Sequence, residues 1–425
     1  MHKTKMLRCL GSGVFLGLFF AGSAAVAMEN TLRGGISLGQ DYDSNIYRDN
    51  QGRETEWTTS ISPSMTLLSS GPRENYFFRY APGLVYSHRT DNERIDHALL
   101  AKFDKKWTEH VRTLLQDSFR RAEDPYEDAE IGVRLRDSRG RNRYSHNSFL
   151  ASMEYDYAQA SLVRLSYANQ VLDHSEAGQD DFVKHTPGLA LTHRFNPQWS
   201  GVADYAYTKG DFDASDDLDQ HAANAYLYYN LSPSTKIFGR YGYTEVDYDG
   251  PSVDYDIHTA TAGLDRALSP TTALFLEGGG SFFVRDAGGD RDSLYFRLSL
   301  KEELQRGLFT FSAESGLDEQ QFSGVTDQGV SRYWKVKGDL RQQLLKDLQG
   351  MLSLSYREDT YLERVIGEDE REFRTDASLS YAFWQYYQAT VRYTYVNMDA
   401  DLAANSYDDN RVFFILSTER DLLKW

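Results

Sequence analysis

Apolar and polar residues alternate with a period of two along much of this chain, and this alternation limits the folds it can adopt. In residues 294–301, apolar side chains occupy the even positions, while Tyr, Arg, Ser and Lys occupy the odd ones. The segments 334–341 and 388–395 alternate in the same way. Because neighbouring side chains of an extended strand point to opposite faces, the pattern predicts strands with one apolar and one polar face.

Two kinds of connection, one short and one longer, alternate between these segments. Short turn signals, such as those at 196–197, 231–235 and 268–272, recur about every 36 to 40 residues, as expected for long hairpins in a membrane barrel. Soluble β-sandwiches place turns every ~8 to 12 residues instead. The longer connections are acidic, as in 211–217 and 368–372. Most of the negative charge therefore lies in the longer connection of each hairpin repeat.

The hairpin repeat predicts an even number of strands, about twenty, as in bacterial single-chain barrels, with eighteen as the alternative if a terminal pair is misread. The expected strands are 31–43, 55–69, 74–88, 94–107, 111–122, 144–157, 160–173, 181–194, 199–210, 218–231, 235–247, 256–268, 272–285, 291–304, 308–320, 331–344, 348–360, 371–384, 387–398 and 409–421. In lipid every backbone polar group must be paired, which forbids an open sheet edge. The predicted fold is all-β: a single closed antiparallel transmembrane β-barrel, with short periplasmic turns, longer acidic extracellular loops and both termini periplasmic.

Three prolines fall inside expected strands. Pro63, Pro82 and Pro187 each lack the N–H that a strand donates to its neighbour. We therefore expect β-bulges or strand ends at these positions.

The first 27 residues have the pattern of a secretory signal peptide. Lys3, Lys5 and Arg8 precede an apolar run, and small residues at 25 and 27 suit a signal peptidase. We expect residues 28–425 to form the barrel. Cys9, the only cysteine, lies in the leader, so no disulfide or thiolate metal site is expected in the barrel.

The charge of the chain argues against a nucleic-acid partner. The formal net charge is -17, and removal of the three basic residues of the leader makes it -20. A field of this sign repels phosphate. The partners expected instead are outer-membrane lipid and lipopolysaccharide.

No catalytic motif stands out, so we expect no enzyme, no catalytic residue and no cofactor. Ser87 with His88, and Ser145 with His146, are adjacent pairs whose side chains point to opposite faces of a strand. The acidic loops allow two interpretations. They are hydrated charges, or their hard oxygen ligands bind divalent cations diffusely and bridge lipopolysaccharide phosphates.

The alternation assigns many basic side chains to the inward face of the barrel. The lumen-lining basic residues expected are Arg79, Lys102, Arg164, Lys236, Arg240, Arg297, Lys301, Lys335, Lys337, Arg341, Arg357, Arg374 and Arg392. The inward aromatics expected are Tyr226, Tyr228, Phe238, Tyr295 and Tyr333. Aromatic rings stack on sugars and Arg binds carboxylates, so this lumen suits an anionic polysaccharide. Alternatively, the cations pair with inward Asp104, Asp339 and Asp376 and only hold the wall in shape.

The longest connection, 123–143, is basic among acidic loops. It contains five arginines, namely Arg134, Arg136, Arg139, Arg141 and Arg143. We expect it to fold inward and constrict the pore.

Several segments together resemble the porin-2-like outer-membrane β-barrel proteins. They are residues 39–48, Trp57 with 61–63, 80–84, 118–121 before Asp124, and 410–417. The resemblance implies the outer membrane of a Gram-negative bacterium, a role beside exopolysaccharide export, and a periplasmic export partner. The chain departs from the usual barrel-assembly signal, because Glu419 and Asp421 interrupt the alternation before Trp425.

Three functions remain open at this stage. The first is a non-catalytic conduit for an exported (exo)polysaccharide. The second is a general diffusion porin for small solutes, which would form oligomers. The third is a barrel plugged by its loops that acts as an adhesin or scaffold.

Overall fold

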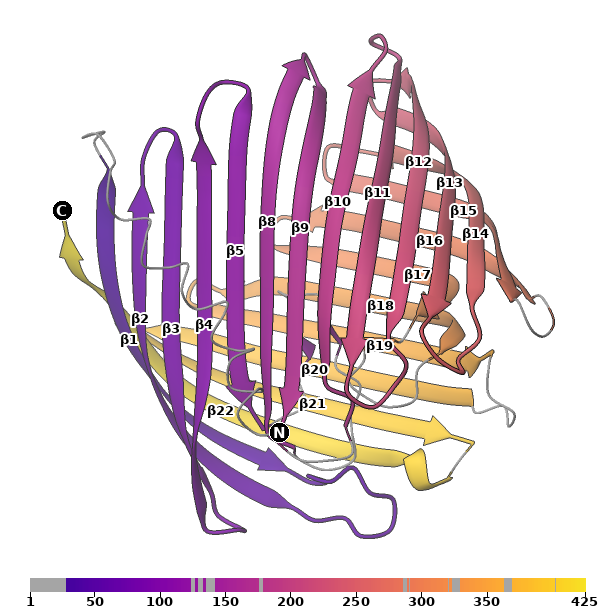
Figure 1. Ribbon diagram of the computed structural model, residues 1–425. Helices are drawn as coiled ribbons and strands as arrows, with labels where there is room; N and C mark the ends of the chain where they lie inside the picture. The colour runs from indigo at the N-terminus through magenta and orange to yellow at the C-terminus, as the bar shows by residue number, and fades with distance from the viewer. Residues whose placement is uncertain are drawn as a thin grey trace.

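A computed structural model shows one closed antiparallel β-barrel (Figure 1). It describes residues 28–123, 127–128, 133–134, 142–175, 179–285, 289, 291–319, 321–322, 329–362, 369–401 and 403–425. The expected leader, 1–27, lies outside these residues. Within the described part of the chain, no helix is long and apolar enough to cross a membrane.

Twenty long strands form the barrel, and within the described residues a two-stranded hairpin and one short 3-10 helix accompany them. The barrel strands are β1 (Glu29–Asp43), β2 (Glu56–Ser70), β3 (Glu74–Ser87), β4 (Asn92–Lys106), β5 (Val111–Ala122), β8 (Tyr144–Ala158), β9 (Ser161–His174), β10 (Phe182–Arg194), β11 (Trp199–Phe212), β12 (Leu218–Ser232), β13 (Thr235–Tyr248), β14 (Tyr255–Ala267), β15 (Thr272–Arg285), β16 (Arg291–Leu304), β17 (Gly307–Glu319), β18 (Val330–Leu345), β19 (Leu348–Tyr361), β20 (Asp369–Phe383), β21 (Tyr387–Ala400) and β22 (Tyr407–Lys424). The hairpin is β6 (Glu127–Asp128) with β7 (Val133–Arg134), and the helix η2 is Ala403–Asn405.

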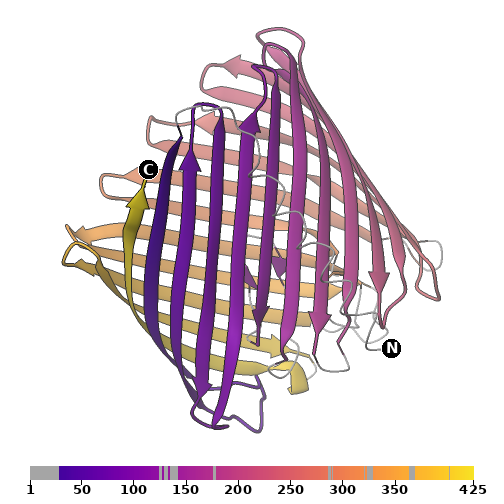
Figure 2. The same ribbon diagram turned by 60° about the vertical axis from the view of Figure 1, so that its left-hand side comes forward.

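The predicted barrel and its strand number are confirmed. The barrel closes between its first and last strands, since β1 pairs with β22 along nearly its whole length. Asn30 and Trp425 exchange two backbone hydrogen bonds of 3.0 and 3.1 Å, so Trp425 and the start of β1 lie at the same rim. Figure 2 shows strands of the near and far walls crossing at a steep angle, as tilted barrel strands must.

The two acids that disturb the C-terminal alternation prove to be inward-facing residues near the rim. Glu419 pairs in register with Gly35, and Asp421 with Arg33. Arg33 Nε and Asp421 Oδ1 are 2.8 Å apart. A register shift between Leu32 and Arg33 accompanies this end of the strand. The acids therefore keep to the polar face.

The expectation of bulges or strand ends at the three prolines is wrong. Pro63 and Pro82 lie in the middle of β2 and β3, where the ladder between these strands is interrupted but resumes in the same register. Pro187 of β10 interrupts its ladder with β11 in the same way and stays paired with Tyr167 of β9. Each proline removes hydrogen bonds on one side only, and the strand continues through it.

The candidate site lies in the lumen

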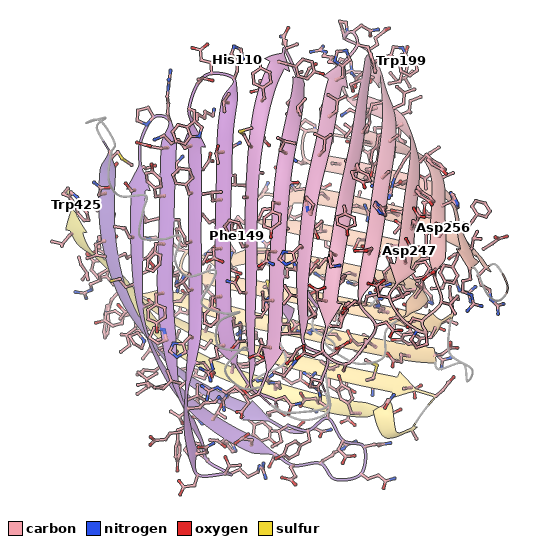
Figure 3. All side chains as sticks on the ribbon, viewed as in Figure 1. His110, Phe149, Trp199, Asp247, Asp256 and Trp425 are labelled. Atoms are coloured by element: carbon pink, nitrogen blue, oxygen red, sulfur yellow. The ribbon has the colours of Figure 1, made fainter. Side chains whose placement is uncertain are left out.

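Contacts across the barrel show which face of the sheet is the inner one. Gln220 of β12 donates a 2.7 Å hydrogen bond to Glu319 at the end of β17, although β13 to β16 lie between them along the wall. Such a bond can form only through the interior. The opposite face carries exposed apolar side chains, including Leu294 of β16 and Trp334 of β18. In Figure 3, His110 and Trp199 lie at the rim of short turns, and Asp247 and Asp256 lie toward the other end of β13 and β14.

The register places all thirteen predicted lumen cations on the inner face. Directly opposite residues of paired strands share a face, and Arg297 of β16 lies opposite Glu277 and Glu314. The same rows continue around the barrel to Arg79 and Lys102 on β3 and β4. The five predicted aromatics lie on this face too.

Six of these cations form ion pairs along the wall. Arg357 of β19 is the most strongly held, with Asp318 and Asp359 each 2.5 Å away. The other five pairs are Arg164–Glu154 (2.6 Å), Arg374–Asp376 (2.8 Å), Lys301–Glu303 (2.9 Å), Lys337–Asp339 (3.0 Å) and Arg240–Glu277 (3.6 Å). Of the inward acids expected as partners, Asp339 and Asp376 bind predicted cations, while Asp104 binds Arg112 at 2.5 Å.

The remaining cations form no ion pair with any residue that the structure describes. They are Arg79, Lys102, Lys236, Arg297, Lys335, Arg341 and Arg392. Lys236 Nζ lies 5.5 Å from the centre of the Tyr228 ring, and the Arg392 guanidinium lies 4.7 Å from that of Phe413. Arg297 and Arg341 are well exposed to the lumen. These seven side chains carry positive charge without an ion pair, although inward acids such as Glu277 and Glu314 lie opposite Arg297 in the ladder.

Aromatic rings form a continuous track on the inner face of β12, β13 and β15. Tyr226 and Tyr228 stack with ring centres 5.9 Å apart. Phe238 lies 5.6 Å from Tyr228 on one side and 5.6 Å from Phe275 on the other. The Phe238 ring covers Gly263 of β14, where a side chain would collide with it. The glycine therefore allows the rings to meet across an intervening strand.

Arg240 joins this track to β16. Its guanidinium carbon lies 5.5 Å from the ring centres of both Tyr226 and Tyr295. Its terminal nitrogens donate to the Tyr295 hydroxyl at 3.1 Å and to Asn224 Oδ1 at 3.2 Å. Because so many partners hold the arginine, it fixes the position of the two rings.

A buried apolar cluster lies on the inner face nearer the long-loop rim, and the sequence analysis missed it. Its core comprises Leu218, Val246, Tyr255, Ile257, Phe283 and Val330. A second cluster of Ala122, Tyr144, Leu172 and Phe182 continues it around the wall, and Phe212 and Phe322 contact both. We call these two groups together the mouth cluster. It shows that the inner face is not polar along its whole length.

Phe322, from the connection between β17 and β18, crosses the lumen to reach the mouth cluster. Its ring centre is 5.3 Å from that of Phe182 and 5.2 Å from that of Phe212. A side chain on Gly210 of β11 would come within 2.8 Å of the ring, so the glycine makes room for it. The neighbouring Gln321 is buried and donates to the hydroxyls of Tyr248 and Tyr255. A loop residue is thus fixed to the opposite wall.

The constriction expected from residues 123–143 falls mostly outside the described residues, so it stays a prediction. Arg136, Arg139 and Arg141 are not described, and of Arg134 only the backbone of β7 is. The side chain of Arg143 donates a 2.7 Å hydrogen bond to the carbonyl of Ile95 on β4.

Ser87 and His88, one of the adjacent pairs considered from sequence, have their contacts on opposite faces of β2. Ser87 donates to Glu56, whereas His88 contacts Thr59, which lies on the other face of β2. Among the described residues, no three His, Cys, Asp or Glu side chains gather as a metal site would require.

A closed barrel with an apolar outer face and a charged lumen defines a porin-like protein of the Gram-negative outer membrane. The chain belongs to the family described as putative beta-barrel porin 2, whose model matches residues 128–268 and 309–420, more than half of the chain. This family agrees with the resemblance seen in the sequence. No curated protein sequence matches the chain.

Solved structures share the fold at low sequence identity. A mutant of the ferric enterobactin receptor PfeA of Pseudomonas aeruginosa aligns with a TM-score of 0.53 and 8% identity, covering 94% of this chain and 81% of the receptor. The siderophore receptor PirA of the same organism aligns with a TM-score of 0.50 and 10% identity, covering 94% of this chain and 82% of the receptor. OccK2 of that organism, solved in complex with glucuronate, aligns with a TM-score of 0.45 and 12% identity, covering 93% of this chain and 98% of OccK2. These likenesses show the fold alone.

Proposed function

We propose that the barrel is a non-catalytic conduit for saccharides that carry negative charge. The observation behind this proposal is the track of stacked rings, Tyr226, Tyr228, Phe238 and Phe275, beside cations that lack ion-pair partners. Aromatic faces bind the C–H faces of sugars. Guanidinium groups bind carboxylates, often with two hydrogen bonds. A wall with both groups suits a sugar with an acidic substituent.

An exported (exo)polysaccharide is the polymeric form of this cargo. A polymer needs several stacking positions in succession, and the track supplies the partly exposed rings of Tyr226, Tyr228 and Phe275, which the buried Phe238 ring connects. In this form of the proposal, a periplasmic export partner would meet the rim of short turns. Lipopolysaccharide would surround the other rim, with divalent cations between its phosphates and the acidic loops.

Flux into proteoliposomes tests the proposal. The purified barrel is reconstituted, and the entry of galactose, galacturonate and a short polygalacturonate is compared at equal concentration. We expect galacturonate to enter faster than galactose, because the unpaired cations attract it. Equal rates for the two sugars would overturn the preference for charge.

The polymer distinguishes the remaining functions. Its passage supports an export conduit, whereas passage of the monomers alone supports a diffusion porin. A barrel that passes none of the three solutes would be a plugged adhesin or scaffold, and the conduit would be rejected.

A further inference from the structure

The ladder between β16 and β17 stops before either strand ends. Its last pair toward the long-loop rim is Phe296 with Ser315. Beyond this pair, β16 continues to Arg291 with only β15 as its described partner, and β17 continues to Glu319 with only β18. An unpaired strand edge leaves a row of N–H and C=O groups without strand partners. Such a break within a barrel wall indicates that the two strands separate there.

The end of β17 lies on the lumen side of the wall. Trp334 of β18 points outward, so the alternation should turn Val330 and its ladder partner Glu319 outward as well. Val330 is instead fully buried in the mouth cluster. Glu319 accepts the hydrogen bond of Gln220, whose side chain faces the lumen. The outward side of this strand end is therefore packed against the lumen side of β12 to β15.

The residues beside Glu319 follow the same course. Leu317 packs against the mouth cluster, and Phe322, beyond the strand, reaches Phe182 on β10. We call residues 316–319, together with Gln321 and Phe322, the tucked edge. Because the tucked edge lies inside the wall, it occupies part of the lumen at the level of the mouth cluster.

The end of β16 has a pattern that fits the tucked edge as a ladder partner. Leu294 points outward and is 69% exposed, more than any other large apolar side chain within a described strand. In the register of the ladder below, Leu294 would lie opposite Leu317, and Ser293 opposite Asp318. The first pair would place two leucines side by side in lipid, and the second would place two polar side chains in the lumen. Both strand ends therefore suit a second, fully paired arrangement.

The tucked arrangement carries a cost that the paired one lacks. Glu319 Oε1 is buried and has no hydrogen-bond partner among the described residues. Leaving a buried acceptor unsatisfied costs free energy, because the group has lost its water. In the paired arrangement Glu319 would lie opposite Asp292, at the rim, where water is available. Apolar packing therefore favours one arrangement, whereas backbone pairing and the hydration of Glu319 favour the other.

We propose that the tucked edge is a gate at the long-loop mouth of the pore. In the closed state it lies inside the wall, as in this structure. In the open state residues 316–319 return to the wall and pair with 292–295 of β16, which frees the lumen beside β12 to β15. Packed interfaces of this kind switch between discrete positions and do not deform continuously. The gate does not depend on which solute the barrel carries, so salt current alone tests it.

A disulfide that only the open state can form provides the test. Leu294→Cys with Leu317→Cys places two thiols on opposite sides of the wall in the closed state. In the open state the thiols lie directly opposite each other, within the reach of a disulfide. Leu298→Cys with Ala313→Cys is the matched control, because these two residues are paired in the ladder of both states. Cys9, the only cysteine of the chain, lies in the expected leader.

Both cysteine pairs should form disulfides on mild oxidation in the outer membrane. Oxidation of the test pair should hold the gate open and raise the single-channel conductance about twofold, because a wider pore passes more ions. A reducing agent should reverse the rise, and oxidation of the control pair should leave the conductance unchanged. A test pair that forms no disulfide when the control pair does, or a disulfide that leaves the conductance unchanged, would overturn the proposal.

A single thiol covers the case in which the cysteine pair does not fold. A small bimane fluorophore on Leu317→Cys contacts lipid only in the open state, where lipids with a nitroxide on the acyl chain quench it. Adding Phe322→Ala removes a contact that holds the gate closed, so the quenching should increase about twofold as the open population grows. Equal quenching in the two chains would reject the gate.

Discussion

The mouth cluster and the ring-and-cation wall belong to one lumen but are built in opposite ways. In the mouth cluster, apolar side chains such as Phe283 and Val330 are fully buried, and Phe322 reaches them from across the barrel. On the wall, Tyr226, Tyr228 and Arg297 remain accessible. A row of small polar residues, Thr259, Ser281 and Ser293, separates the two regions.

The difference indicates separate roles for the two regions of the lumen. Apolar packing fixes the position of a side chain and therefore sets the width available to a solute. Uncompensated charge acts over a longer range and sets which solutes are concentrated there. We expect substitutions in the mouth cluster to change how much passes, and substitutions on the wall to change what passes.

The largest effect on passage is expected from Phe322→Ala. Loss of the ring removes its contacts with Phe182 and Phe212 and frees the loop from the far wall. Single-channel conductance in planar bilayers should rise more than for any substitution on the wall. Phe311→Ala, on the outward face of β17, is the control. Unaltered conductance in the Phe322 variant would show that the mouth cluster does not limit the pore.

The paired part of the wall should show its role in stability. Removing a buried partner of an ion pair costs about 3 kcal/mol or more, because the remaining charges are uncompensated. Arg357→Ala leaves both Asp318 and Asp359 in this condition. Urea unfolding in lipid vesicles should detect the loss, while Arg297→Ala should stay within about 0.5 kcal/mol of the native barrel. Equal losses would erase the distinction between paired and unpaired cations.

The ring track should control how long a sugar stays. One aromatic contact is worth about 1 kcal/mol, so Tyr228→Ala should shorten the residence of galacturonate roughly five-fold. Current interruptions in a planar bilayer report this residence time. Tyr381→Ala, at an exposed outward position, serves as the control. A residence time that does not change would show that sugars bypass the track.

The smallest effect is expected from single unpaired cations. Arg297→Ala should lower the preference for anions slightly, since other cations remain in the lumen, and should weaken galacturonate binding because Tyr295 lies beside it. Arg79→Ala on β3 removes a similar exposed charge far from the track. It should alter ion selectivity to the same degree without changing galacturonate binding, as reversal potentials and current interruptions would show.

Much of the barrel could be predicted from the sequence because its signal is local. The period of two sets the face of each residue, and the predicted strand ends differ from the observed ones by at most three residues, the largest difference being at the end of β22. The mouth cluster could not be predicted in this way. Phe322 meets Phe182 because of barrel closure, and no local pattern records which strands face each other across a lumen. A lone phenylalanine in a polar loop and Gly210 opposite it were the only available signals.

The prolines show a second limit. The missing N–H of Pro63 and of Pro187 does interrupt a ladder, but the consequence for the strand depends on its other neighbour. A long ladder on the other side holds each strand in register, as β9 does for Pro187. A bulge would have turned every following side chain to the wrong face, so the interrupted ladder is the smaller loss.

Single-channel recording of the native barrel with galacturonate and galactose, each added at the long-loop side, tests the central claim most directly. A conduit for acidic saccharides should show a steady open current that galacturonate interrupts and that galactose at the same concentration interrupts far less. A barrel that carries no current, or one that both sugars interrupt equally, would contradict this account of the lumen.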